Sequence, residues 1–323
     1  MTTGWNKNVK SALHHWWPQG VSRFWANQKG LVTRLSPDGI TTEAPPKNFG
    51  AIRNAHQIVI RDSSNDGSVT YRESFEHLFN SVDRQFPTVI EWLKSLERRA
   101  VEFHLPFRKR FHVVSAPEDK LRYLIQGLFS LVVRSPLNRD ACIAAAEFVR
   151  SHISKEEREV LITANLKNCL GNSMRRVDTS GKLIVCYSQN REFIFGDGFH
   201  HTISFFGSMP LTGEVLVPLT TNIAVLYVRP TSFTVEPQVM TLQLGDPEVQ
   251  FLNDTIQIYA KQEIFFRSQC PDITEPFKRR EHLRFADSHH WIADLVRSIP
   301  GIHARRGVLL LQDPRFAKKF QID

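Results

Sequence analysis

The fold is decided by residues 215–227, which read VLVPLTTNIAVLY. Two apolar runs, 215–219 and 223–227, are rich in the β-branched and aliphatic residues that favour strands, and only three residues separate them. Because so short a connection leaves no room for a helical crossover, the two runs must lie antiparallel. This stretch therefore predicts part of an antiparallel sheet.

The same pattern occurs twice before this stretch, in the short apolar runs 183–187 and 192–195. Turns join the runs, so we expect a mainly antiparallel sheet over about residues 181–245. Asp246 and Pro247 then form a favourable helix start, which predicts one helix over about 246–268 that packs against the sheet.

The centre of the chain, about residues 71–171, has the apolar spacing of helices. Between Tyr71 and Arg98 this spacing predicts one amphipathic helix or a pair of them. Pro87 lies inside the run, so it either kinks one helix or opens the second at its first turn. Caps and stops indicate three more helices: from Ser115 to Ser135, over about 138–152, and from Ser154 to near Gly171.

Residues 13–62 are broken by turns, and the runs 31–35 and 57–61 between the turns have strand composition. The whole chain is therefore predicted to be an α+β protein: an N-terminal β-hairpin segment, a central helical bundle, and a C-terminal, mainly antiparallel sheet with one packing helix. We expect a single domain over residues 1–272, followed by a basic C-terminal extension over 273–323.

The composition narrows the classes of protein that the chain can be. Its 323 residues are 41% hydrophobic and carry a net charge of +8, with a pI near 9.4. This charge favours anionic partners such as nucleic acid or other phosphate-bearing ligands, although solvated surfaces also explain its short basic runs. The four cysteines are too far apart for a CxxC half-site and are typical of buried thiols in a reducing compartment.

Several function classes lack their signatures in this sequence. No apolar run approaches the roughly 18 residues that a membrane span needs, so we expect a soluble, cytoplasmic protein with no membrane partner. There is no P-loop, dinucleotide fingerprint, zincin helix, GxSxG elbow or set of kinase motifs, which argues against most cofactor-dependent enzymes. The sequence indicates no oligomeric state.

A pair of histidines, His14 and His15, is the first candidate for chemistry. Imidazole suits proton transfer near neutral pH and is a common metal ligand, although side chains of adjacent residues diverge. The alternative is structural: Trp16, Trp17 and Phe24 anchor the N-terminal segment, and one of the histidines forms a cap or a hydrogen bond within the fold.

The second candidate is the group Glu73, Glu76, Asn80 and Asp83, in which steps of three and four residues place the last three along one helix face. Carboxylates at the border of an apolar stripe can enter a cleft and hold a divalent cation or act as acid and base. The alternative is an ordinary helix surface whose carboxylates pair with arginines.

Two further candidates lie where elements end. Arg134 and Arg139 flank a helix break, so their guanidinium groups can converge on a phosphate or can tie two helices to a buried acid. Asp197 lies between two glycines at a strand end, with His200 and His201 close behind, which fits a metal or acid–base site or a tight turn.

In this order, the four candidates resemble a mostly bacterial family known as domain of unknown function 4238. The resemblance covers about residues 13–268, and the matching positions are His14, His15, Pro18, Phe24, Glu76, Asp83, Arg134, Pro136, Arg139, Asp197, Pro218, Leu219, Thr220, Asn253 and Ala260. This chain departs from the family where Gly198 and Phe199 replace an Asn-Pro pair. Because the family's activity is not established, the resemblance implies a fold and site positions without a reaction.

We therefore expect the four candidates to meet in one basic-rimmed cleft that acts as a metal-assisted phosphodiesterase or nuclease-like hydrolase. We expect His14 or His15 to act as the general base or as a metal ligand. We expect Glu76, Asp83 and Asp197 to bind a divalent cation, and Arg134 and Arg139 to stabilise the charge on the phosphoryl group. One alternative is a non-catalytic nucleic-acid or nucleotide-binding module that uses the same arginines and the tryptophans. Another is a structural polar core with no active site.

Overall fold

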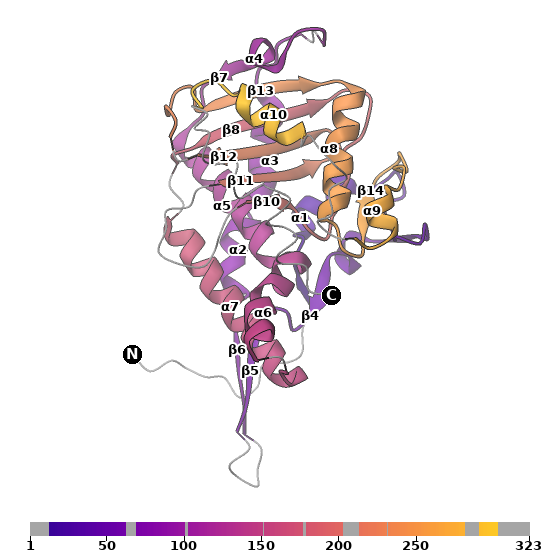
Figure 1. Cartoon of the computed structure of the whole chain (residues 1–323), viewed down its shortest axis with the longest axis vertical. Helices are drawn as coiled ribbons and strands as arrows, with labels where there is room; N and C mark the ends of the chain where they lie inside the picture. Colours follow the sequence, from indigo (N-terminus) through magenta and orange to yellow (C-terminus); the bar gives the residue numbers. More distant parts are fainter. Residues whose placement is uncertain are drawn as a thin grey trace.

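A six-stranded sheet, in the order β10-β11-β12-β8-β13-β7, forms the upper part of the computed structural model in the view of Figure 1. The structure describes residues 13–62, 69–100, 103–150, 152–176, 179–202, 213–230, 232–281 and 291–302. The strands are β7 (His112–Val114), β8 (Lys182–Ser188), β10 (His200–His201), β11 (Gly213–Thr220), β12 (Ile223–Arg229) and β13 (Val239–Leu244). Only β13 and β8 pair in parallel, which confirms the mainly antiparallel sheet.

The stretch 215–227 forms the expected hairpin, with Val215 opposite Tyr227 and Val217 opposite Val225. Its residues are buried on both faces of the sheet, which explains why the runs are continuously apolar rather than alternating. Helices α3 (Phe86–Ser95) and α5 (Glu118–Arg134) pack on this sheet. The Tyr187 hydroxyl on β8 donates to the Leu93 carbonyl of α3, and the Phe129 ring of α5 contacts Tyr227.

The three helices indicated by caps and stops are present as α5, α6 (Pro136–Arg150) and α7 (Lys155–Arg176). The Ser154 hydroxyl accepts the Glu157 amide at 3.2 Å, as the predicted capping box requires. Helix α7 continues past Gly171 to Arg176, because a glycine inside a helix weakens it without ending it.

The structure corrects the start of the helical region. The helical region was expected to begin at Tyr71. Residues up to Ser74 instead belong to strand β6 (Val69–Ser74), which pairs with β5 (Gln57–Asp62). The hydrogen bonds of this pairing override the helical spacing, and the helix α2 starts only at His77 (His77–Asp83). Pro87 lies in the first turn of α3, so it opens a second helix rather than kinking one.

The N-terminal segment joins a second, four-stranded sheet in the order β3-β2-β14-β9. Its strands are β2 (Val32–Leu35), β3 (Thr41–Ala44), β9 (Phe195–Gly196) and β14 (Ile264–Phe266), and β1 (Leu13–His15) pairs separately with β4 (Ala51–Arg53). Of the predicted strand 192–195, only the last residue, Phe195, lies in a strand, the short β9. Short helical turns complete this part: α1 (Gln19–Ser22), η1 (Arg23–Trp25) and η2 (Pro46–Asn48).

Tryptophans anchor the N-terminal segment, as one alternative predicted. Trp17 is fully buried and stacks on Phe195 with ring centroids 4.0 Å apart. The Trp25 indole donates to the Leu219 carbonyl of β11 at 3.1 Å, which ties this segment to the large sheet. Gly50 has φ +61° and lies so close to Trp17 that a Cβ there would be 2.6 Å from the Trp17 Cβ.

Helix α8 (Asp246–Tyr259) is present as predicted but ends earlier. Part of the expected extension 273–323 packs with the core, because Phe277 of α9 (Glu275–Lys278) and the apolar face of α10 (Trp291–Ser298) are buried. A short helix, α4 (Phe107–Arg110), precedes β7. The extension also contains a second histidine pair, His289 and His290, and the apolar run 308–311, and both lie outside the described residues. Of the helices described, none is both long and apolar enough to cross a membrane.

Candidate functional site

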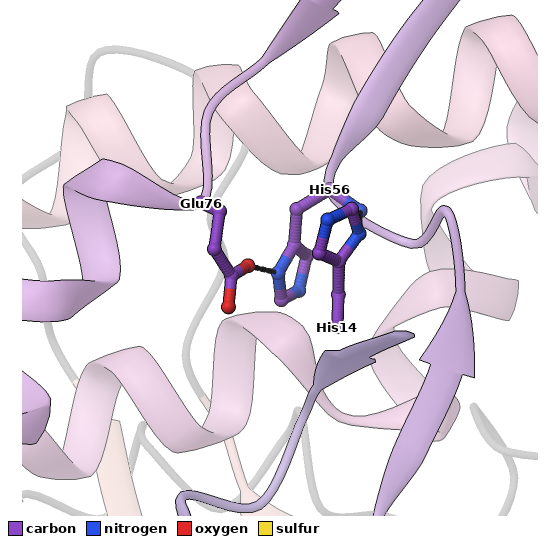
Figure 2. Close-up of side chains that lie close together, drawn as sticks. All are labelled: His14, His56 and Glu76. Carbon is purple, nitrogen blue, oxygen red and sulfur yellow. Dashed lines mark hydrogen bonds and ion pairs between the residues drawn. The ribbon is translucent and has the colours of Figure 1, made fainter. Parts of the chain in front are cut away.

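Three polar side chains from separate segments converge: His14, His56 and Glu76 (Figure 2). Each contributes a ligating or proton-accepting atom, and these atoms lie within 4.8 Å of one another. His14 and His56 are 4% and 1% exposed, whereas Glu76 is partly exposed. We call this group the His–Glu centre.

Backbone pairing between distant segments brings these residues together. Strand β1 pairs with β4, and the alternation along β1 leaves Leu13 exposed and turns His14 inward. The turn after β4 contains Asn54 in the left-handed conformation, with φ +58°, and delivers His56 to the same place. The Phe75 amide donates to the His56 carbonyl at 3.0 Å, which fixes Glu76 beside it just before α2.

Within the centre, each histidine uses its Nδ1 atom in a different way. His56 Nδ1 is hydrogen-bonded to the Glu76 carboxylate, and the His56 backbone amide donates to His14 Nδ1 at 3.0 Å. The imidazole rings are nearly parallel, with an interplanar angle of 14° and centroids 5.2 Å apart. Figure 2 shows the rings side by side, with the carboxylate directed at His56.

These hydrogen bonds assign the proton positions on both rings. A carboxylate only accepts, so His56 carries its proton on Nδ1 and keeps the lone pair on Nε2. The backbone amide only donates, so a neutral His14 has its lone pair on Nδ1 and its proton on Nε2. Neither Nε2 atom has a hydrogen-bond partner in the part of the chain that the structure describes. The centre therefore offers one base and one hydrogen-bond donor.

Burial keeps both imidazoles neutral. It lowers the pKa of His56 to about 4, although the hydrogen bond and charge of Glu76 act in the opposite direction. Burial also lowers the pKa of His14, partly offset by Glu76 and reinforced by His15 and Arg139. For Glu76, burial raises the pKa, but the hydrogen bond from His56 together with the electrostatic effects of His56, His14 and Arg134 outweighs it, and the net pKa is lowered. At neutral pH the centre holds two neutral rings and one carboxylate.

Arg134 and Asp83 form an ion pair next to the centre. The guanidinium binds both carboxylate oxygens, at 3.0 and 2.5 Å, and also donates to the His15 carbonyl at 3.4 Å. It lies over the Phe79 ring at 4.8 Å. These contacts tie α5 to α2 and β1, which is the structural role that the sequence left open for this pair.

Arg139 also lies beside the centre, but its bonds are to other groups. Its Nη1 donates to the Ala55 carbonyl at 2.9 Å and its Nη2 donates to Glu159 at 3.1 Å. The side chain of Arg139 is 9% exposed. The terminal nitrogens of both arginines are thus already bonded to protein groups, whereas Arg134 Nε is buried and has no hydrogen-bond partner among the residues that the structure describes.

Asp197 and His15 have partners outside the centre. The Asp197 carboxylate accepts the amides of Lys261 and Gln262 at 2.6 and 3.0 Å and fixes the turn between α8 and β14. Burial raises the pKa of Asp197 to about 6, against the two amide bonds, which favour the ionised form. His15 Nε2 lies 3.1 Å from the Lys47 carbonyl. Of the three expected cation ligands, Glu76 belongs to the His–Glu centre, whereas the Asp83 carboxylate binds Arg134 and the Asp197 carboxylate binds backbone amides.

Sequence reasoning missed His56. It is a single histidine in a turn directly before a strand, and its neighbours Ala55 and Gln57 carry no catalytic pattern. The only feature of the sequence that could have identified His56 as a site residue is its position at the boundary of a predicted strand. The same feature made Asp197 a candidate.

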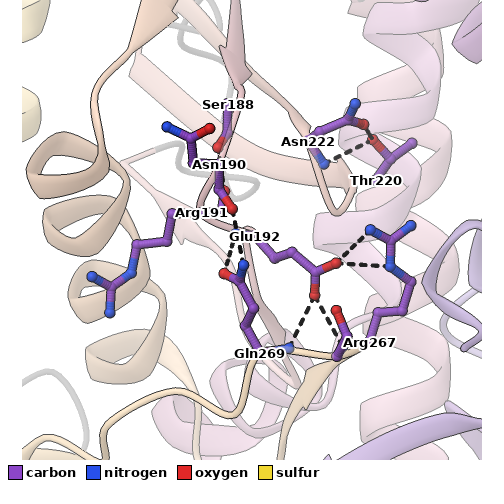
Figure 3. A network of polar contacts seen from close by, with 9 residues as sticks. Ser188, Asn190, Arg191, Glu192, Thr220, Asn222, Arg267 and Gln269 are labelled. Atoms are coloured by element: carbon purple, nitrogen blue, oxygen red, sulfur yellow. Dashed lines mark hydrogen bonds and ion pairs between the residues drawn. The ribbon is translucent and has the colours of Figure 1, made fainter.

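A polar cavity of about 370 Å³ lies elsewhere, between the turn 190–192 and the loop 269–271. Its principal carboxylate, Glu192, accepts the Arg267 guanidinium and the amides of Ser268 and Gln269 (Figure 3). The Asn253 side chain donates to the Glu192 carbonyl at 3.0 Å. Because these bonds hold the turn to the loop, we interpret this network as structural.

No family model, curated protein or solved structure matches the chain. The resemblance to domain of unknown function 4238 stays a prediction, and the geometry of the His–Glu centre is the basis for the function proposed below.

Proposed function

We propose that this chain hydrolyses phosphodiester bonds, with nucleic acid as the substrate class, by acid–base catalysis at the His–Glu centre. One observation carries the proposal: Glu76 holds Nδ1 of His56, which leaves Nε2 as a base beside the Nε2–H donor of His14. A carboxylate that orients a histidine base is the arrangement by which many hydrolases activate a nucleophile.

The residues divide the reaction as follows. His56 Nε2 takes a proton from water while the water oxygen bonds to phosphorus, and Glu76 stabilises the imidazolium that forms. The phosphorus–oxygen ester bond then breaks, and the leaving oxygen receives the proton from His56. His14 keeps its own proton and donates a hydrogen bond from neutral imidazole to a phosphoryl oxygen, where negative charge accumulates.

An anionic substrate is supported by the charges around the centre. After burial, the larger charge effect on both rings comes from Glu76 and raises their pKa, while Arg134 lowers the pKa of His56 and Arg139 lowers that of His14, so these two cations lie close enough to act on the rings. The net charge of +8 acts in the same sense at longer range. The buried thiols of Cys142, Cys169 and Cys186 form no disulfide, which supports a reducing compartment, the cytoplasm, as the location.

A second candidate is the metal-assisted hydrolase predicted from the sequence, now with His14, His56 and Glu76 as ligands of a divalent cation. The proximity of the three groups favours it, because two histidines and a glutamate are a recurrent catalytic set for zinc. It has a cost. A cation on Nδ1 of His14 displaces the His56 amide. A cation on Nε2 requires the neutral ring to give up its only N–H proton or to move it to Nδ1, which breaks the bond from the His56 amide.

The test is hydrolysis of bis(p-nitrophenyl) phosphate, single-stranded DNA and RNA by the full chain in EDTA. We expect turnover in EDTA, and a loss of about a hundredfold or more in kcat for His56→Ala and Glu76→Gln. The matched control is His77→Ala, which removes the exposed histidine next to Glu76 and should leave the rate unchanged.

Three other outcomes would each overturn the acid–base proposal. Activity that disappears in EDTA and returns with Zn²⁺ or Mn²⁺ would establish the metal-assisted hydrolase instead. Salt-sensitive nucleic-acid binding without turnover, unchanged by EDTA and by Glu76→Ala, would indicate a binding module. If the variants lower only the melting temperature, with neither turnover nor binding in any form of the chain, the polar cluster is structural.

A further inference from the structure

We propose that Arg139 is a positioning residue that sets the proton position on His14 through a single peptide bond. The inference rests on the proposed function for its kinetic consequence, but its physical claim concerns hydrogen bonding alone. It replaces the direct contact with phosphoryl charge that the sequence suggested for Arg139.

The peptide that joins Ala55 to His56 lies between Arg139 and His14. Its carbonyl accepts Arg139 Nη1 at 2.9 Å, and its N–H donates to His14 Nδ1 at 3.0 Å. In a trans peptide the carbonyl and the N–H point in opposite directions, so the two side chains bind opposite edges of one rigid plane. Ala55 and His56 are each 1% exposed, so water does not compete for this peptide.

The guanidinium strengthens the bond on the far side of the plane. A charge-assisted hydrogen bond to a carbonyl polarises the amide, and hydrogen bonds in series reinforce one another in a buried environment. The His56 N–H is therefore a better donor to His14 Nδ1 when Arg139 is present. A stronger bond at Nδ1 keeps the His14 proton on Nε2, which is where the proposed reaction needs a donor.

Arg139 has a second partner, which provides a matched control. Glu159 accepts its Nη2 at 3.1 Å and lies on α7, so this ion pair ties α6 to α7 without touching the peptide. Glu159→Gln weakens the ion pair and leaves the bond to Ala55. Arg139→Met removes both bonds, and Arg139→Lys keeps a cation that can reach one of them.

The experiment is ¹⁵N NMR of histidine-labelled full chain, which distinguishes protonated from unprotonated ring nitrogens, combined with kinetics on bis(p-nitrophenyl) phosphate. For Arg139→Met we expect the His14 Nδ1 and His56 amide resonances to shift, with kcat reduced about tenfold and KM changed less than about twofold. Glu159→Gln should leave both resonances and the rate as in the wild type. Arg139→Lys should restore the resonances in part, and it provides the measurement if Arg139→Met does not fold.

The outcomes separate this inference from the proposed function. Equal effects of Glu159→Gln and Arg139→Met on stability, with no change in the His14 resonances, would overturn the positioning role and leave the hydrolase proposal intact. Shifted resonances in a chain that hydrolyses no phosphodiester would support the positioning role and remove the proposed function.

Discussion

Acidification should destabilise this protein through His56 in a way that a variant can isolate. The pKa of this buried imidazole lies at about 4, against an ordinary value of 6.5. Above pH 6.5 the ring is neutral in both the folded and the unfolded chain, so its contribution to stability is fully present. As the pH falls towards 4, the unfolded chain binds a proton that the folded chain excludes, and this stability is lost.

The size of this stability loss follows from the difference between the pKa of His56 in the unfolded and in the folded chain. At about 1.4 kcal/mol per pH unit, the distance between 6.5 and about 4 corresponds to about 3 kcal/mol, most of which is lost by about pH 4.5. We therefore expect the free energy of unfolding to fall by about 2–3 kcal/mol more in the wild type than in His56→Gln between about pH 7 and 4.5.

The assay is urea unfolding followed by tryptophan fluorescence, because Trp16, Trp17 and Trp25 are buried in the core. Only the pH dependence is compared, so a constant loss of stability in His56→Gln does not affect the result. Asp197 titrates in the same pH range in both proteins and cancels in the difference. Parallel pH profiles for the wild type and His56→Gln would refute the argument that His56 is neutral because it is buried.

Three further changes test other parts of the structure. Asp83→Ala leaves the Arg134 guanidinium buried without its carboxylate, and we expect a loss of about 3 kcal/mol in urea unfolding, with a smaller loss when Arg134→Met is added. Asp197→Asn places an amide N–H against a backbone donor, and a loss of about 1–3 kcal/mol should persist below pH 4, where charge no longer matters; full stability at that pH would contradict it. Gly50→Ala combines a left-handed φ with a clash against Trp17, so its melting temperature should fall by several degrees, at a cost of about 1–3 kcal/mol. An unchanged melting temperature would mean that this segment moves freely.

The elements that sequence reasoning predicted are those whose signals are local. The hairpin at 215–227 follows from two apolar runs and a turn too short for any other connection, and the capping box at Ser154 starts α7 where expected. Strand β6 was mistaken for helix because its apolar spacing is compatible with either period. What decides the outcome is its pairing with β5, which residues 69–74 alone do not reveal.

The site was predicted only in part, because its residues are brought together by long-range pairing. His14 and Glu76 were candidates on their own chemistry, but His56 reaches them through the pairing of β1 with β4, two segments that are far apart in the sequence. Asp197 fits a catalytic strand end equally well in sequence, yet its carboxylate is used by amides of the turn at 261–262. Convergence of side chains depends on such long-range contacts, which no local pattern encodes.

The strand order of the large sheet sets the order in which the chain can fold. β13 lies between β8 and β7, so β7 at residues 112–114 has no strand to pair with in this sheet until residues 239–244 are available. Contacts of this sequence separation make folding slow, and they leave an edge and the apolar faces of α3 and α5 uncovered while the chain is being synthesised. The N-terminal half, which carries the whole His–Glu centre, is therefore completed from the C-terminal side, and a chain ending before Leu244 would hold these residues without the sheet that supports them.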